Sequence, residues 1–137
     1  MNVMTRQEKD SLGVIDVPST ALWGAQTQRA LINFAIGSDP IPIEIIHSLA
    51  IIKKASAIVN SRLGVIDNKS SHLIINAADQ IENGLHDKEF PLKVWQSGSG
   101  TQSNMNVNEV ISNLISKEEG YPLGSNKPVH PNDHVNR

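Results

Sequence analysis

The feature that most constrains the fold is a long amphipathic segment that ends at a glycine. From Ile43 to Leu63, apolar residues recur at helical spacing in two neighbouring rows, formed by Ile45, Leu49, Ile52, Ser56 and Val59 and by Ile46, Ala50, Lys53 and Ala57. This spacing predicts a helix that buries one side. Gly64 stands where a helix C-terminal cap belongs. Because aromatic residues make up only 4% of the chain, we expect an aliphatic core of packed helices.

Three further helices are predicted from the same periodicity, over residues 22–34, 70–85 and 103–116. Ser19 or Thr20 is a candidate cap for the first, and Asp67 or Asn68 for the second. The turn signal Asp10-Ser11-Leu12-Gly13 predicts a short hairpin or an extended arm that ends at Pro18. Residues 118–131 are predicted to form a loop. The expected fold class is mainly α with a short N-terminal β-hairpin or extended arm.

The composition limits the possible functions. The chain has 137 residues with a formal net charge of −2 and no cysteine, which excludes disulfides and cysteine-ligated metal. The charge gives no basic footprint for nucleic acid. No apolar run approaches the ~20 residues that span a bilayer. The polar start is not that of a secretory signal peptide. We therefore expect a cytoplasmic location, or the mitochondrial matrix if the source is eukaryotic.

A glycine-rich turn precedes the last predicted helix and is the first candidate site. Gly98-Ser99-Gly100-Thr101 brings two hydroxyls and a flexible backbone to a helix start. Backbone N–H groups and hydroxyls in this position suit an anion such as a carboxylate. The alternative is a turn and a helix cap without ligand, which residues alone favour because Ser and Thr are also cap residues.

The second candidate site is the polar loop His130-Pro131-Asn132-Asp133-His134. Two histidines four residues apart resemble a metal pair, but Pro131 argues against a regular helix through them and no third ligand lies nearby in sequence. We therefore expect no metal. An anion-binding loop is the better interpretation, with His130 and Asn132 as donors and Asp133 orienting His130. A solvated loop with local turns remains the alternative.

Three separated stretches resemble class II fumarate hydratases of the fumarase/aspartase superfamily. They are the run from Ser97 to Asn113 (SGSGTQSNMNVNEVISN), the run from Val129 to Asn136 (VHPNDHVN), and the opening pieces EKDSLG and LWGAQTQRA. They occur in order and cover almost the whole chain. Aspartate ammonia-lyases are similar but usually read Gly-Ala-Gly-Thr-Ser at the glycine turn.

The resemblance implies reversible hydration of fumarate to (S)-malate in the tricarboxylic acid cycle, without metal or organic cofactor, by a homotetramer. It assigns Ser99, Gly100 and Thr101 to substrate binding. It assigns a second dicarboxylate site to His130, Pro131, Asn132 and Asp133, with Lys127 as a basic helper.

Because family members are about three times longer, the resemblance implies that residues 1–137 are an N-terminal lyase domain. We expect this domain to be cut at its junction with a central helical bundle, to hold no catalytic residue and to be inactive alone. The alternatives are an aspartate ammonia-lyase-type enzyme and a non-catalytic dicarboxylate-binding or packing domain.

Overall fold

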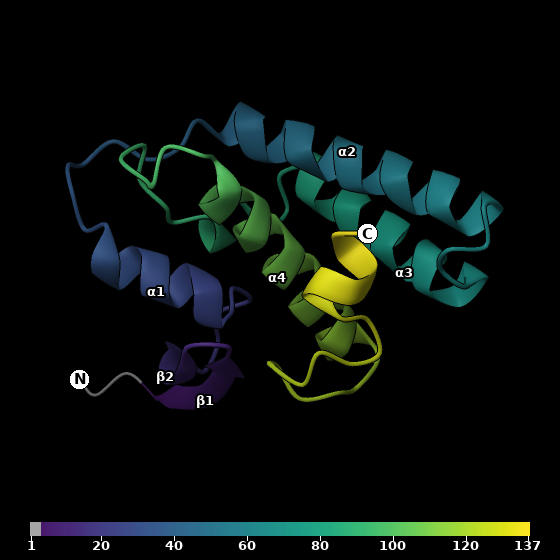
Figure 1. Ribbon diagram of the computed structural model, residues 1–137, viewed down its shortest axis with the longest axis horizontal. Helices are drawn as coiled ribbons and strands as arrows, with labels where there is room; N and C mark the ends of the chain where they lie inside the picture. Colours follow the sequence, from purple (N-terminus) through teal and green to yellow (C-terminus); the bar gives the residue numbers. More distant parts are fainter. Residues whose placement is uncertain (1–3) are drawn as a thin grey trace.

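The computed structural model describes residues 4–137 as a β-hairpin followed by four α-helices and two short helical turns (Figure 1). The elements are β1 (Thr5–Asp10), β2 (Gly13–Pro18), α1 (Ala25–Asn33), α2 (Ile43–Arg62), α3 (Asn68–Glu82), the 3₁₀ turn η1 (Asp87–Glu89), α4 (Thr101–Glu118) and the π-helical turn η2 (Pro131–Val135). The predicted mainly α fold with an N-terminal hairpin is confirmed. Within residues 4–137, no helix has both the length and the apolar character needed to cross a membrane.

The hairpin forms where the turn signal predicted it. β1 and β2 pair antiparallel from Thr5 opposite Pro18 to Asp10 opposite Gly13. The Asp10 carboxylate accepts the backbone N–H of Leu12 at 2.9 Å, which is a local turn bond of the kind that favours Asp in turns. Val17 is fully buried against the rest of the chain.

Helix α4 is the centre of the molecule. α2 and α3 run side by side against one flank of it, and α1 lies against the other, with the hairpin packed on α1 (Figure 1). Every residue of α4 from Asn106 to Ser116 is buried. The core around it is aliphatic as expected, and its largest fully buried side chains include Ile46, Ile74, Ile81, Ile111 and Ile115.

Polar side chains of α4 hold the following loop in place. The Ser112 hydroxyl donates to the carbonyl of Val129 at 2.6 Å, and the Ser116 hydroxyl donates to the carbonyl of Lys127 at 2.7 Å. Asn113 accepts the N–H of Gly124 at 2.7 Å. These bonds satisfy buried groups of both partners, so the loop that leads to η2 has a fixed path across α4.

The buried side of α2 carries the second predicted row of residues and not the first. Ile45, Ile52 and Val59 are about half exposed, at 47%, 56% and 50%, whereas the second row is the one that packs on α3 and α4. Ile46 and Ala50 of that row are 2% and 0% exposed. Both rows are apolar, so helical spacing identified the helix but could not choose its buried side.

Several helix ends also differ from the prediction. α1 begins at Ala25 rather than Leu22, and neither Ser19 nor Thr20 caps it, because carboxylates from distant elements hold its first turn instead. α3 ends at Glu82 rather than residue 85, since Gly84 takes a φ of +75°. Its cap is Asp67, as predicted, and α4 is two residues longer than expected at each end.

Candidate functional site

The glycine turn lies at the exposed start of α4. Gly100 has a φ of +74° and occupies the N-cap position, and Thr101 is the first helical residue. The Ser99 hydroxyl lies 3.3 Å from the Ser97 hydroxyl and accepts the N–H of Thr101 at 3.4 Å. Gly100 has no side chain to cap the helix, and first-turn N–H groups have no intrahelical acceptor. Ser99, Gly100 and Thr101 therefore present donors to solvent at a positive helix end.

The polar loop folds into the turn η2, with Pro131 in its first turn. The His130 ring Nδ1 accepts the N–H groups of Asn132 and Asp133 at 3.1 and 3.2 Å. The His134 Nδ1 accepts the N–H of His130 at 2.8 Å. An Nδ1 that accepts carries no proton, so each neutral ring holds its proton on Nε2. His130 can then donate through Nε2, while the Asp133 carboxylate lies 3.5 Å from its Nδ1.

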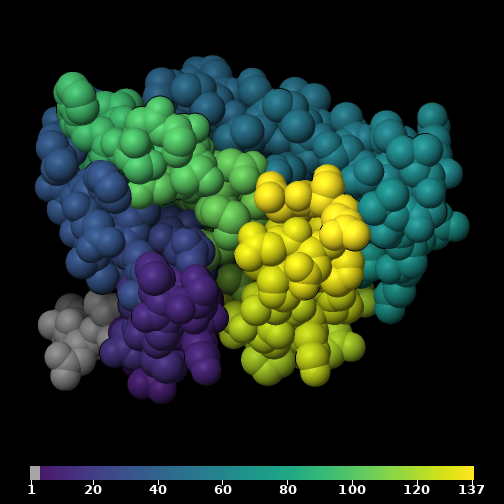
Figure 2. Space-filling view, viewed as in Figure 1, coloured from purple at the N-terminus to yellow at the C-terminus, as the bar shows by residue number. Residues whose placement is uncertain are grey.

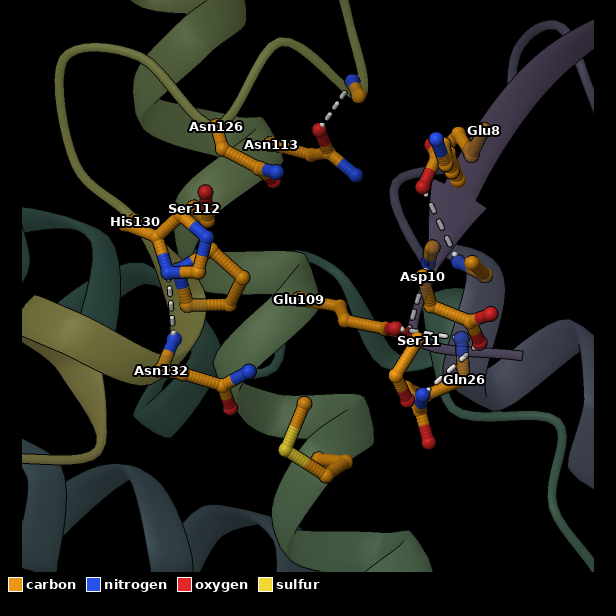
Figure 3. Close-up of a pocket in the computed structure, with 16 residues that line it drawn as sticks. Glu8, Asp10, Ser11, Gln26, Glu109, Ser112, Asn113, Asn126, His130 and Asn132 are labelled. Atoms are coloured by element: carbon orange, nitrogen blue, oxygen red, sulfur yellow. Dashed lines mark hydrogen bonds between the residues drawn. The ribbon is translucent and has the colours of Figure 1, made fainter. Parts of the chain in front are cut away.

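A cavity of about 250 Å³ lies between the hairpin, the start of α1, the middle of α4 and η2. Figure 2 shows the hairpin and the C-terminal segment next to each other, with part of α4 visible between them. In Figure 3, His130 and Asn132 lie on one side of the cavity and Asp10 and Gln26 on the other, with Glu109 between them. The cavity therefore joins residues from both ends of the chain.

The structure brings together part of the second predicted set. His130, Pro131 and Asn132 line the 250 Å³ cavity, and Asn126 joins them. Its lining does not include Lys127 or Asp133, whose side chains are exposed. Among residues 4–137, no three His, Asp or Glu side chains cluster in a way that could hold a metal ion.

Thr101 borders a different, adjacent cavity of about 220 Å³ between the hairpin tip, α1 and the start of α4. Arg29, Asn33 and Gln102 also line it. Gln26 and Met105 line both cavities, so the cavity that Thr101 borders adjoins the one that His130 borders, whereas Ser99 and Gly100 line neither of the two. Arg29 is held by Asp10 through two bonds of 2.8 and 2.9 Å, and this guanidinium lowers the pKa of the Asp10 carboxyl.

Sequence reasoning missed Glu109, which lies in the wall of the larger cavity and is 6% exposed. Its carboxylate accepts the N–H groups of Gly24, Gln26 and Thr27 at 2.9, 2.7 and 3.1 Å. Burial raises its pKa, although these bonds act in the opposite direction. The available signal was a charged residue between the apolar residues Val107 and Val110 of the helix, since buried carboxylates are rare unless they are paired.

The chain matches a family described as lyases over residues 13–137. This chain belongs to the lyase family. Among its relatives, the class II fumarate hydratase of Prochlorococcus marinus strain MIT 9313 is 62% identical over 134 residues, and class II fumarate hydratase 1 of Pseudomonas aeruginosa is 58% identical over 134 residues. Each match covers 98% of this chain and 29% of the relative. The chain therefore spans less than a third of the length of these relatives.

Solved lyase structures have the same fold. The class II fumarase of Schistosoma mansoni superposes with a TM-score of 0.93 at 48% identity, over 97% of this chain and 28% of that one. A Brucella melitensis protein titled fumarate lyase:delta crystallin, solved bound to cobalt, superposes with a TM-score of 0.91 at 42% identity, over 97% and 29%. The hairpin and helices of this lyase chain are thus those of the fumarase/aspartase N-terminal domain, as predicted.

Proposed function

We propose that residues 1–137 are the N-terminal portion of a class II fumarate hydratase, which hydrates fumarate reversibly to (S)-malate. The observation that carries the proposal is the identity of 62% to a class II fumarate hydratase over 98% of this chain. The complete protein would be a homotetramer, as the resemblance implies, and would lie in the cytoplasm, or in the mitochondrial matrix if the source is eukaryotic. The catalytic acid and base would lie outside these residues, and the isolated chain would be inactive.

The glycine turn suits the proposed substrate. Fumarate and malate are dicarboxylates, and the reaction builds negative charge on one carboxylate when a proton leaves the neighbouring carbon. Donors that are already oriented toward that carboxylate stabilise the charge as it develops. Ser99 and Thr101 offer hydroxyl donors, and Gly100, with its φ of +74°, leaves the helix start uncovered. In this proposal the turn binds substrate and stabilises the anion without supplying the acid or the base.

The η2 loop is proposed as a second dicarboxylate site. His130 through Nε2 and Asn132 through its amide are the donors, with Pro131 shaping the turn and Asp133 beside the ring. Lys127 is kept as the basic helper that the resemblance implies. The opposite wall of the cavity carries Glu8, Asp10 and Glu109. A dianion would therefore bind on the η2 side, away from these carboxylates.

The substrate choice tests the proposal. The translation product of the complete reading frame that contains residues 1–137 should hydrate fumarate and form no ammonia from L-aspartate. Ammonia release with no malate formation would favour an aspartate ammonia-lyase, the alternative within the same superfamily. Binding of fumarate without turnover by the complete product would favour a non-catalytic dicarboxylate-binding protein.

A further inference from the structure

The first turn of α1 is anchored by carboxylates from two other elements. The first N–H groups of any helix have no intrahelical acceptor. Here Glu109 of α4 accepts those of Gly24, Gln26 and Thr27, and Glu8 of β1 accepts that of Ala25 at 3.0 Å. Glu109 is more than 80 residues away from these donors along the chain. The position of α1 on α4 is therefore fixed by a bond network and not by apolar packing alone.

The chain leaves room for this anchor at Gly24. A β-carbon at this position would lie 2.9 Å from the Glu109 Cδ and 2.9 Å from the Glu8 Oε2. The Gly24 φ of −117° is extended backbone that any residue adopts, so the backbone does not require glycine here. A side chain at this position would instead have to displace the two carboxylates.

The anchored helix carries one wall of the cavity that contains Thr101. Gln26 and Arg29 of α1 line this cavity together with Thr101 and Gln102 of α4. Gln26 is itself one of the residues whose N–H Glu109 accepts, at 2.7 Å. A shift of α1 along α4 would move Gln26 and Arg29 relative to Thr101. Asn113 of α4 also donates to the carbonyl of Leu22 at 2.9 Å, which holds the segment before α1, but Glu109 is the α4 side chain that accepts from the first turn itself.

We propose that Glu109 is a positioning residue, which holds α1 so that the wall formed by Gln26 and Arg29 faces Thr101 at the distance substrate binding needs. This inference rests on the proposed function, because it takes the Thr101 cavity as the place where the dicarboxylate binds. Glu109 lines the larger cavity and is not among the residues that line the Thr101 cavity, so in this proposal it acts on substrate binding through α1.

The carboxylate is needed as an acceptor at both of its oxygens. Oε1 accepts from Gln26, and Oε2 accepts from both Gly24 and Thr27. In a Glu109→Gln variant, either orientation of the amide would turn an NH₂ group toward at least one of these N–H groups. A buried donor facing a donor is left unsatisfied, so the first turn of α1 would shift or fray.

The test uses the translation product of the complete reading frame with Glu109→Gln. We expect the KM for fumarate to rise about tenfold or more while kcat stays within about threefold, since misplaced binding groups weaken substrate binding. Amide hydrogen exchange at residues 24–29 should accelerate, with exchange in α2 and α3 unchanged. Glu118→Gln is the matched control, because this carboxylate lies on the exposed end of α4 and contacts Gln80.

A second variant disturbs the position of the Glu109 carboxylate without removing its charge. Gly24→Ala keeps Glu109 but places a methyl group against its carboxyl, so we expect the same rise in KM. An unchanged KM in Glu109→Gln, with a loss of folded enzyme alone, would overturn the proposal. If the wild-type product does not hydrate fumarate, the proposed function fails, and the exchange experiment still decides whether Glu109 anchors α1: unchanged protection at residues 24–29 would overturn that anchor.

Discussion

Lys53 carries a buried positive charge that we expect to cost stability at neutral pH. This α2 residue is 7% exposed, and its ammonium donates to the Asn136 side-chain oxygen at 2.8 Å. Among residues 4–137, none of the ion pairs includes Lys53. Burial accordingly lowers the pKa of Lys53 from 10.5 to about 8. The perturbation we consider is Lys53→Met, which keeps the length of the side chain and removes the charge.

The size of the effect follows from the pKa. One pKa unit corresponds to about 1.4 kcal/mol, so the shift from 10.5 to about 8 sets an upper limit of about 3.5 kcal/mol for the cost of the charge. Water that reaches the ammonium reduces this cost to about 1–2 kcal/mol. Met also loses the bond to Asn136, but Asn104 still donates to that oxygen at 3.1 Å. We expect Lys53→Met to raise the free energy of unfolding by about 1 kcal/mol near neutral pH.

The direction in which the free energy of unfolding changes with pH follows from the lowered pKa of Lys53. The pKa is lower in the folded chain, so the unfolded chain binds the proton more tightly. The free energy of unfolding of the wild type should therefore rise between about pH 8 and pH 10.5, and the advantage of Lys53→Met should disappear there. Urea denaturation of both chains at several pH values measures this. Lys54→Met is the matched control, because Lys54 pairs with Asp79 and its pKa is raised instead.

The reasoning would be refuted by a Lys53→Met variant that is less stable than the wild type by the same amount at neutral and alkaline pH. Such a result would mean that the bond to Asn136 outweighs the cost of the buried charge.

Three further predictions concern the stability of the chain, and urea denaturation measures each of them. Ile81→Ala should lower the free energy of unfolding by about 2–4 kcal/mol, because Ile81 is fully buried between α3 and its neighbours; a loss under about 1 kcal/mol would contradict this packing. Asp67→Ala should cost about 1 kcal/mol, since its carboxylate caps α3 by accepting the N–H of Ser70 at 2.8 Å, and Asp67→Asn should recover most of this loss. Because burial raises the pKa of Glu109 above 4.5, this group should make the wild type lose stability as the pH rises through that pKa, and a Glu109→Gln chain with the same pH profile would disprove it.

The sequence predicted where the helices lie along the chain better than it predicted which of their sides are buried. Periodicity located α2, α3 and α4, because apolar residues at three- and four-residue spacing need a common buried side. It could not choose between the Ile45 and Ile46 rows of α2, because that choice depends on where α3 and α4 lie. It also placed the start of α1 too early, since the groups that hold the first turn, Glu8 and Glu109, come from other parts of the chain.

In the candidate site, too, local features could be predicted and long-range ones could not. The local motif around Gly100 and the turn after His130 could be recognised from neighbouring residues, because caps and turns are local interactions. The two cavities could not be predicted, since they join the hairpin to η2 and α1 to α4. The role of Glu109 depends on the same long-range contacts.

The most direct test of the central claim is the rate of fumarate hydration by the complete translation product, compared between the wild type and Thr101→Val. Valine keeps the shape of threonine and removes the hydroxyl at the start of α4. If the glycine turn binds the substrate carboxylate, the loss of one hydrogen bond to a charged group should lower kcat/KM by about tenfold or more, corresponding to about 1.5–3 kcal/mol. An active wild type with an unchanged kcat/KM in Thr101→Val would contradict the assigned role of the turn, and an inactive wild type would contradict the proposed hydratase itself.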